Sequence, residues 1–83
     1  MRFHYTFAVS KLLRDLGEEG APLRAAIRAL QSNPTPPNAI TTPERPGRYE
    51  QPVRIGTRGF WLIWRVEQDR GERVITITAI EEN

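Results

Sequence analysis

The chain has 83 residues, of which 39% are hydrophobic and 27% charged, a composition ordinary for one small globular domain. It contains no cysteine and one histidine, which excludes a disulfide framework and thiol chemistry, and we expect neither a metal nor another cofactor. No apolar run approaches the roughly 20 residues of a membrane span, and Met1–Phe7 lacks the features of a secretory signal, so we expect a cytoplasmic protein.

The first third of the chain predicts a strand followed by two helices. Arg2–Thr6 alternates, with Phe3 and Tyr5 on one face and His4 on the other, as in a short strand. A first helix carries apolar residues at helical spacing and stops at Gly17. A second helix begins near Pro22 and ends before Asn33-Pro34. The apolar positions of the two helices are Val9, Leu12, Leu13, Leu16, Leu23, Ala26, Ile27 and Leu30.

The middle of the chain predicts a long loop. Six of the seven prolines lie between Asn33 and Pro52, a density that excludes regular elements and leaves a loop of about fifteen residues. Such a loop is either functional or a passive connector stiffened by proline, and the pattern does not decide between them. Tyr49–Ile55 turns extended again, and Gly56 and Gly59 close a turn before the next strand.

The C-terminal segment predicts an antiparallel hairpin. Phe60–Val66 and Val74–Ile80 are aromatic and β-branched, and they flank the polar stretch Glu67–Arg73. Alternation in the first of these strands predicts two apolar faces, so we expect it to be central in its sheet. One face holds Phe60, Leu62, Trp64 and Val66, and the other holds Trp61, Ile63 and Arg65.

These elements predict a single α+β domain over residues 1–83. We expect a strand, an α-hairpin and three further strands in a twisted four-stranded antiparallel sheet, with the helices on one face. The predicted inward-facing set is Val9, Leu12, Leu16, Leu23, Ile27, Leu30, Phe60, Leu62 and Trp64.

The charge is unevenly distributed. The net charge is only +2, but the segment from Gly20 to Val66 has seven arginines and two glutamates, a net charge of +5. Eleven of the twelve basic residues are arginine, which suits phosphate and carboxylate recognition but also follows from genomic base composition. A basic middle is compatible with a nucleic acid or with an acidic protein partner.

The chain resembles the RelE/ParE superfamily of toxins from bacterial toxin–antitoxin pairs. The element order agrees, and the strands RIGTRGFWLIWRV and RVITITAIEEN stand where the family has "GxYRLVYxV"-like and "VVxVLxVGxR"-like strands. The resemblance implies a four-stranded antiparallel sheet with an open face opposite the helices. RelE-like members cut mRNA in the ribosome with Arg and Lys on that face, whereas ParE-like members inhibit DNA gyrase without that set. Both are neutralised by an antitoxin that covers the working surface.

The family's catalytic positions are matched only in part. Trp61 stands where RelE-like nucleases carry Arg after the aromatic residue of the third strand, and Asn83 stands where they carry Arg beyond the last strand. Of two basic positions on the preceding strand, Arg54 matches one and Pro52 occupies the other. No C-terminal helix follows to carry the tyrosine that some members place there.

The candidate site residues follow from this comparison and from the charge pattern. We take Arg54 and Arg65 as candidate catalytic residues that supply positive charge, with Glu50 as a base and Tyr49 or His4 as a proton donor. His4 without a partner acid is more typical of an ordinary strand residue. The candidates for nucleic-acid or partner binding are Arg45, Arg48, Arg58 and Trp61, for which a solvated surface and, for Trp61, a core position are the alternatives.

Three functional hypotheses remain open. The first is the toxin of a type II toxin–antitoxin pair that cleaves mRNA on the ribosome, with a cognate antitoxin as its partner. The second is a non-catalytic family member, either a ParE-like gyrase inhibitor or an inactive relative. The third is a small RNA- or protein-binding module. In each, the face of Trp61 and Arg65 is where a partner or a second copy in a homodimer would bind.

Overall fold

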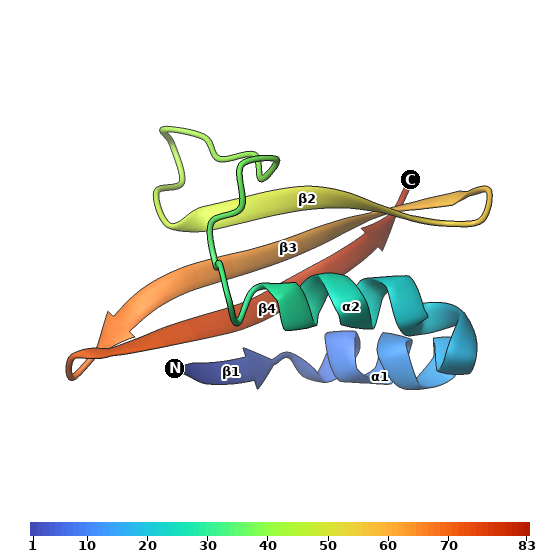
Figure 1. Ribbon diagram of the computed structural model, residues 1–83, viewed down its shortest axis with the longest axis horizontal. Helices are drawn as coiled ribbons and strands as arrows, with labels where there is room; N and C mark the ends of the chain where they lie inside the picture. Colours follow the sequence, from blue (N-terminus) through green and yellow to red (C-terminus); the bar gives the residue numbers. More distant parts are fainter.

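The computed structural model describes residues 1–83 and shows an α+β fold, as predicted (Figure 1). A strand leads into two helices that are joined by a 3-10 turn, and three strands follow after a long loop. The elements are β1 (Arg2–Tyr5), α1 (Phe7–Leu16), η1 (Gly17–Gly20), α2 (Ala21–Ala29), β2 (Arg48–Ile55), β3 (Arg58–Asp69) and β4 (Glu72–Glu82).

The four strands form one sheet in the order β1-β4-β3-β2. The antiparallel pairing of β2 with β3 and of β3 with β4 is confirmed. The expectation that the whole sheet is antiparallel is wrong, because β1 pairs with β4 in parallel. No tight turn joins β1 to β4, so no hairpin fixes their relative direction, and the alternation in Arg2–Tyr5 carries no information about direction.

The first helix ends at the predicted Gly17 and the second begins next to the predicted Pro22, whereas Thr6, predicted as a strand residue, is the cap of α1. The Thr6 side chain accepts a hydrogen bond from the Val9 backbone N–H and so caps α1. Gly17 ends this helix with a φ of 56°, in the left-handed region that favours glycine. Arg24 of α2 donates to the carbonyl oxygens of Leu13 and Gly17, both at 2.6 Å, and so ties the two helices together. No helix of the structure is both long and apolar enough to cross a membrane.

The β3–β4 hairpin has a much tighter turn than the sequence suggested. Both strands extend into the polar stretch that was expected to be the loop, and only Arg70 and Gly71 remain between them. Their φ angles are 54° and 79°, as in a type I′ turn. Charged side chains tolerate these strand positions because the end of the hairpin projects into solvent beyond the helices (Figure 1).

The core lies between the sheet and the helices. Of the predicted inward set, all except Leu12 and Leu16 are buried; Leu16 packs at the margin of the core, and Leu13 takes the place expected for Leu12. On β4, an irregularity opposite Ile63 and Trp64 breaks the alternation, so that Ile77 pairs with Trp64 and Ile80 with Leu62. With strict alternation Ile80 would lie on the face opposite Ile77, and the bulge turns its side chain to the core instead.

The proline-rich loop crosses the sheet from the end of α2 and then lies beyond the outer edge of β2 (Figure 1). The buried indole of Trp64 donates a 2.9 Å hydrogen bond to the carbonyl oxygen of Pro34, at the start of the loop. Further on, Ile40 forms an isolated antiparallel bridge with Glu50, and Gly47 accepts a hydrogen bond from the Val66 backbone N–H. The loop therefore carries a short stretch of pairing that its proline content did not predict.

Replacing Trp64 by Phe should lower the free energy of unfolding by about 2 kcal/mol, because the buried Pro34 carbonyl loses its donor and a small cavity opens. The measurement is urea unfolding followed by circular dichroism. Trp61→Phe is the matched control, since Trp61 lies on the other face of β3 and its side chain donates no hydrogen bond. Equal losses in the two variants would contradict the anchoring role of Trp64.

Candidate functional site

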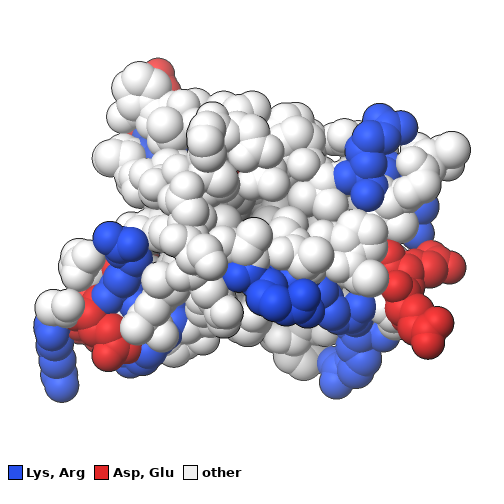
Figure 2. Space-filling model, viewed as in Figure 1, with Lys and Arg blue, Asp and Glu red and all other residues white.

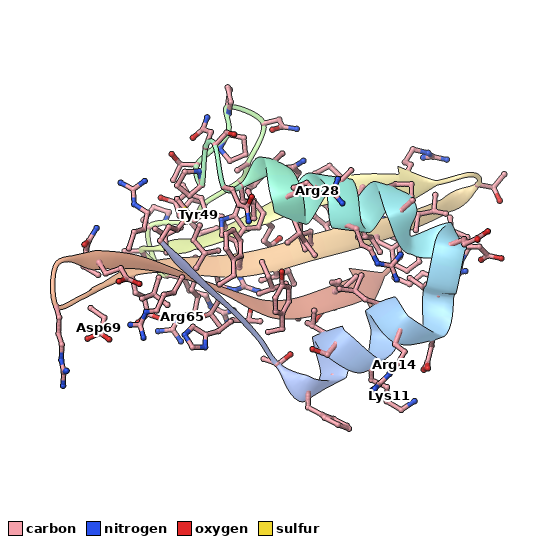
Figure 3. The ribbon with its side chains drawn as sticks, turned by 60° about the horizontal axis from the view of Figure 1, so that its bottom comes forward. Lys11, Arg14, Arg28, Tyr49, Arg65 and Asp69 are labelled. Atoms are coloured by element: carbon pink, nitrogen blue, oxygen red, sulfur yellow. The ribbon has the colours of Figure 1, made fainter.

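One face of the sheet has no helix over it, and we call it the open face. The helices pack on the side of Phe60, Leu62 and Trp64. Figure 3 shows Arg65 on the other side of the sheet from α2. The open face is lined by alternate residues of the four strands: Arg2, His4, Arg48, Glu50, Pro52, Arg54, Trp61, Ile63, Arg65, Glu67, Val74, Thr76, Ala79 and Glu81.

Four residues of the open face stand side by side across the whole sheet, and we call them the cross-strand row. His4 pairs with Thr76, Thr76 with Arg65, and Arg65 with Arg48. Adjacent strands lie about 4.8 Å apart, so the row covers about 14 Å from β1 to β2. His4 and Arg65 are both exposed, whereas Thr76 and Arg48 are half-buried. The sheet thus brings the single histidine of the chain onto the same face as two arginines.

Each arginine of the row has a carboxylate partner two residues away on its own strand. Arg48 Nη1 lies 2.9 Å from Glu50 Oε1, and Arg65 Nη2 lies 3.4 Å from Glu67 Oε2. The side chains of Arg65 and Glu67 are 56% and 50% exposed, so the pair adds little to stability. An incoming phosphate can therefore compete for the Arg65 guanidinium group at a small cost.

The row has the group types that phosphodiester chemistry uses. Two guanidinium forks can hold a phosphate and stabilise the charge that builds up during its cleavage. An imidazole can give or take a proton near neutral pH, and a carboxylate can act as a base. By register, Arg65 lies between His4 on one side and the Arg48–Glu50 pair on the other.

The two candidate catalytic arginines do not share a site. Arg54 lies six residues along β2 from Arg48, the neighbour of Arg65, which at about 3.4 Å per residue separates them by about 20 Å. Arg54 is exposed, pairs with Gly59 and has no ion-pair partner. Arg65 and Arg54 therefore lie toward opposite ends of the open face, too far apart to contact one phosphate.

The candidate binding residues divide between the two faces and the loop. Arg48 belongs to the cross-strand row, and Arg45 is an exposed loop residue three positions before it. Arg58 lies on the helix side, where it forms a two-pronged pair with Glu82 at 2.9 Å, reaches Glu19 at 3.7 Å and covers the Phe60 ring. These contacts within the fold occupy the Arg58 guanidinium group.

Tyr49 lies on the helix side, where it cannot serve as a proton donor on the open face. Its ring stacks on Trp64 with a centroid distance of 5.8 Å. His4, the other candidate donor, does lie on the open face. The alternation of β1 predicts that His4 lies on the face opposite Phe3, but no local pattern indicates the partner or the register of this strand. The association of His4 with Thr76 and Arg65 could not be predicted for that reason.

The apolar part of the open face is smaller than the sequence suggested. Trp61 is half-buried, opposite Pro52 and Glu81. Ile63, which shares this face with Trp61 and Arg65, is only 3% exposed. By register its neighbours are Trp61 and Arg65 on its own strand and Glu50 and Ala79 across it, and these side chains leave it little access to water.

Comparisons with known proteins give no relative for this chain. No protein-family model matches it, and neither a curated protein nor a solved structure matches it significantly. Within the structure, no group of three or more His, Cys, Asp or Glu side chains is placed to hold a metal ion. The resemblance to the RelE/ParE superfamily therefore stays a prediction.

The Arg58–Glu82 pair predicts a pH dependence of stability. The hydrogen bond from Arg58 and its positive charge hold the pKa of Glu82 below its ordinary value of 4.5. A lowered carboxyl pKa stabilises the fold above the ordinary value, and this contribution is lost as the pH falls through the pKa of the folded state. Glu82→Gln should therefore lower the Tm at neutral pH, and the difference should shrink below about pH 4.

The measurement is thermal unfolding across a pH series. Glu81→Gln is the matched control, because Glu81 is its exposed neighbour and forms no ion pair. If the two variants show the same pH-dependent loss, the effect comes from net charge and not from the pair with Arg58.

Proposed function

We propose that this protein is a RelE/ParE-like toxin of a type II toxin–antitoxin pair, and that its open face binds and cleaves RNA. The single observation that carries the proposal is the cross-strand row, which puts His4, Arg65 and Arg48 on one uncovered sheet face. Nuclease members of that superfamily work from the same kind of face. Its surroundings would be the cytoplasm, where ribosomes, mRNA and a cognate antitoxin are present.

In the proposed reaction, the 2′-hydroxyl of a nucleotide attacks the adjacent phosphorus. Glu50 or Glu67 accepts the proton of that hydroxyl, and the new O–P bond closes a cyclic phosphate as the bond to the 5′-oxygen breaks. Arg65 and Arg48 stabilise the charge on the phosphorane. His4 donates a proton to the departing 5′-oxygen, and with Glu50 as the base the acid and the base act from opposite sides of Arg65.

A second candidate function is inhibition of a target without cleavage, as ParE-like members inhibit gyrase. Two observations favour it: Trp61 and Asn83 replace arginines of the nuclease members, and both arginines of the row already pair with carboxylates. A toxin that had lost its activity, or a simple RNA- or protein-binding module, would share these features.

Arg65→Ala should reduce cleavage of ribosome-bound mRNA by about a hundredfold, because the phosphorane loses its central cation. The measurement is primer extension on mRNA in a translation reaction with purified protein. Arg70→Ala is the charge-matched control, since Arg70 is exposed at the hairpin turn and has no ion-pair partner. Wild-type protein that arrests growth without cleaving mRNA would overturn the nuclease proposal and favour the second candidate.

Arg54→Ala should act differently from Arg65→Ala. At about 20 Å along the strand, Arg54 can contact only a distant backbone phosphate, so its loss should raise KM and leave kcat unchanged. Steady-state cleavage kinetics on the same mRNA give both constants. A large fall in kcat for Arg54→Ala would contradict this assignment and would indicate that the reaction takes place at the other end of the open face.

We further propose that the antitoxin, or a second copy of the chain in a homodimer, covers Trp61. Trp61 is half-buried beside Pro52, and Ile40 at the neighbouring edge is 47% exposed. Trp61→Ala should weaken the complex by about 2 kcal/mol or more with little loss of monomer stability, measured by calorimetry and by urea unfolding. Unfolding of the isolated domain with unchanged partner affinity would show that Trp61 is a core residue.

A further inference from the structure

A groove lies on the helix side of the sheet, away from the open face. It has a volume of about 320 Å³ and runs between β1, α1 and α2. Phe3, Leu13 and Ile27 supply its apolar surface, and Tyr5, Arg28 and Gln31 lie with Arg24 around it. Figure 2 shows that basic side chains gather near the middle of this face of the molecule.

The order of elements leaves the groove uncovered. β1 has only four residues and is an edge strand of the sheet. Because α1 begins at Phe7, directly after the Thr6 cap, it continues the direction of β1 and does not fold back over it (Figure 1). α2 runs back alongside α1. The side chains of β1 that face the helices, Phe3 and Tyr5, therefore have α2 on one side of them and the groove on the other. Tyr5 is therefore 45% exposed, and Phe7, beside it in the chain, is 78% exposed.

The groove is basic, and its free charge is concentrated at one residue. None of the residues that line it is acidic. Arg24 is held by the Leu13 and Gly17 carbonyl oxygens, whereas the Arg28 side chain has no ion pair or hydrogen bond. Lys11 and Arg14 point away from α2 (Figure 3). Arg28 is thus an unpaired cation beside an aromatic and aliphatic surface.

We propose that this groove binds an acidic amphipathic segment of a partner protein. The apolar side chains of the segment would contact Phe3, Tyr5 and Leu13, and a carboxylate would pair with Arg28. Exposed aromatic residues beside a free arginine are typical of the centre of a protein interface. Nucleic acid is disfavoured, because one free arginine among apolar side chains provides too few phosphate contacts. The site is independent of the activity proposed for the open face.

The test begins with a display library of random peptides of about fifteen residues, selected on the wild-type protein alone. The selected peptides should be acidic with interspersed apolar residues. Their affinity, measured by fluorescence anisotropy, should fall at least about tenfold for Arg28→Glu and for Tyr5→Ala. Arg70→Glu makes the same charge change at the β3–β4 turn and should have no effect.

A charge swap distinguishes direct pairing from a general change in net charge. Lysine versions of the selected peptides, with each acid replaced, should bind Arg28→Glu more tightly than wild type. Peptides without acid enrichment, or equal affinities for Arg28→Glu and Arg70→Glu, would overturn the proposal. It would also be overturned if the chain alone sediments as a dimer that Arg28→Glu dissociates, since the occupant would then be a second copy.

Discussion

The structure depends on the way Trp64 is buried. Its indole is fully excluded from solvent, so its N–H must find an acceptor, and the carbonyl oxygen of Pro34 provides one at 2.9 Å. That bond fixes the point where the chain leaves the helices. Tyr49 stacks on the same indole from β2. The Trp64 side chain therefore contacts both the beginning of the long loop and the strand β2 that follows it. Between these two points, the loop pairs with the outer edge of β2 through Ile40 and Glu50.

The packing of strand residues against the helices determines which side chains lie on the open face. Because strand side chains alternate, fixing Tyr49 against Trp64 puts Arg48 and Glu50 on the opposite side. The bulge in β4 has a similar effect at the centre of the sheet. It allows Ile77 and Ile80 both to reach the core, while Thr76 stays beside Arg65. The cross-strand row is thus a consequence of core packing, and a change of register in one strand would disperse it.

The sequence predicted the elements of the fold better than their arrangement. The caps, the helix stripes and the β3–β4 hairpin are local patterns, and Gly17 or the alternation around Trp64 can be interpreted without knowing the fold. Pairing between distant segments is not local. Neither the parallel direction of β1 nor its register appears in the sequence, so the association of His4 with Arg65 was missed. The separation of Arg54 from Arg65 also requires the register, because both residues are simply basic strand residues in the sequence.

The excess of arginine in the middle of the chain does not act as one positive surface. Two of these arginines make contacts within the fold. Arg24 donates hydrogen bonds to helix carbonyl oxygens, and Arg58 pairs with Glu82 and covers the Phe60 ring. Of the others, Arg48, Arg54 and Arg65 lie on the open face, Arg28 lies beside the groove on the helix side, and Arg45 lies in the loop. At physiological ionic strength the Debye length is about 8 Å, so the cations on the two faces attract ligands largely independently. Net charge over a segment therefore says little about its partners until the strand register assigns each cation to a face.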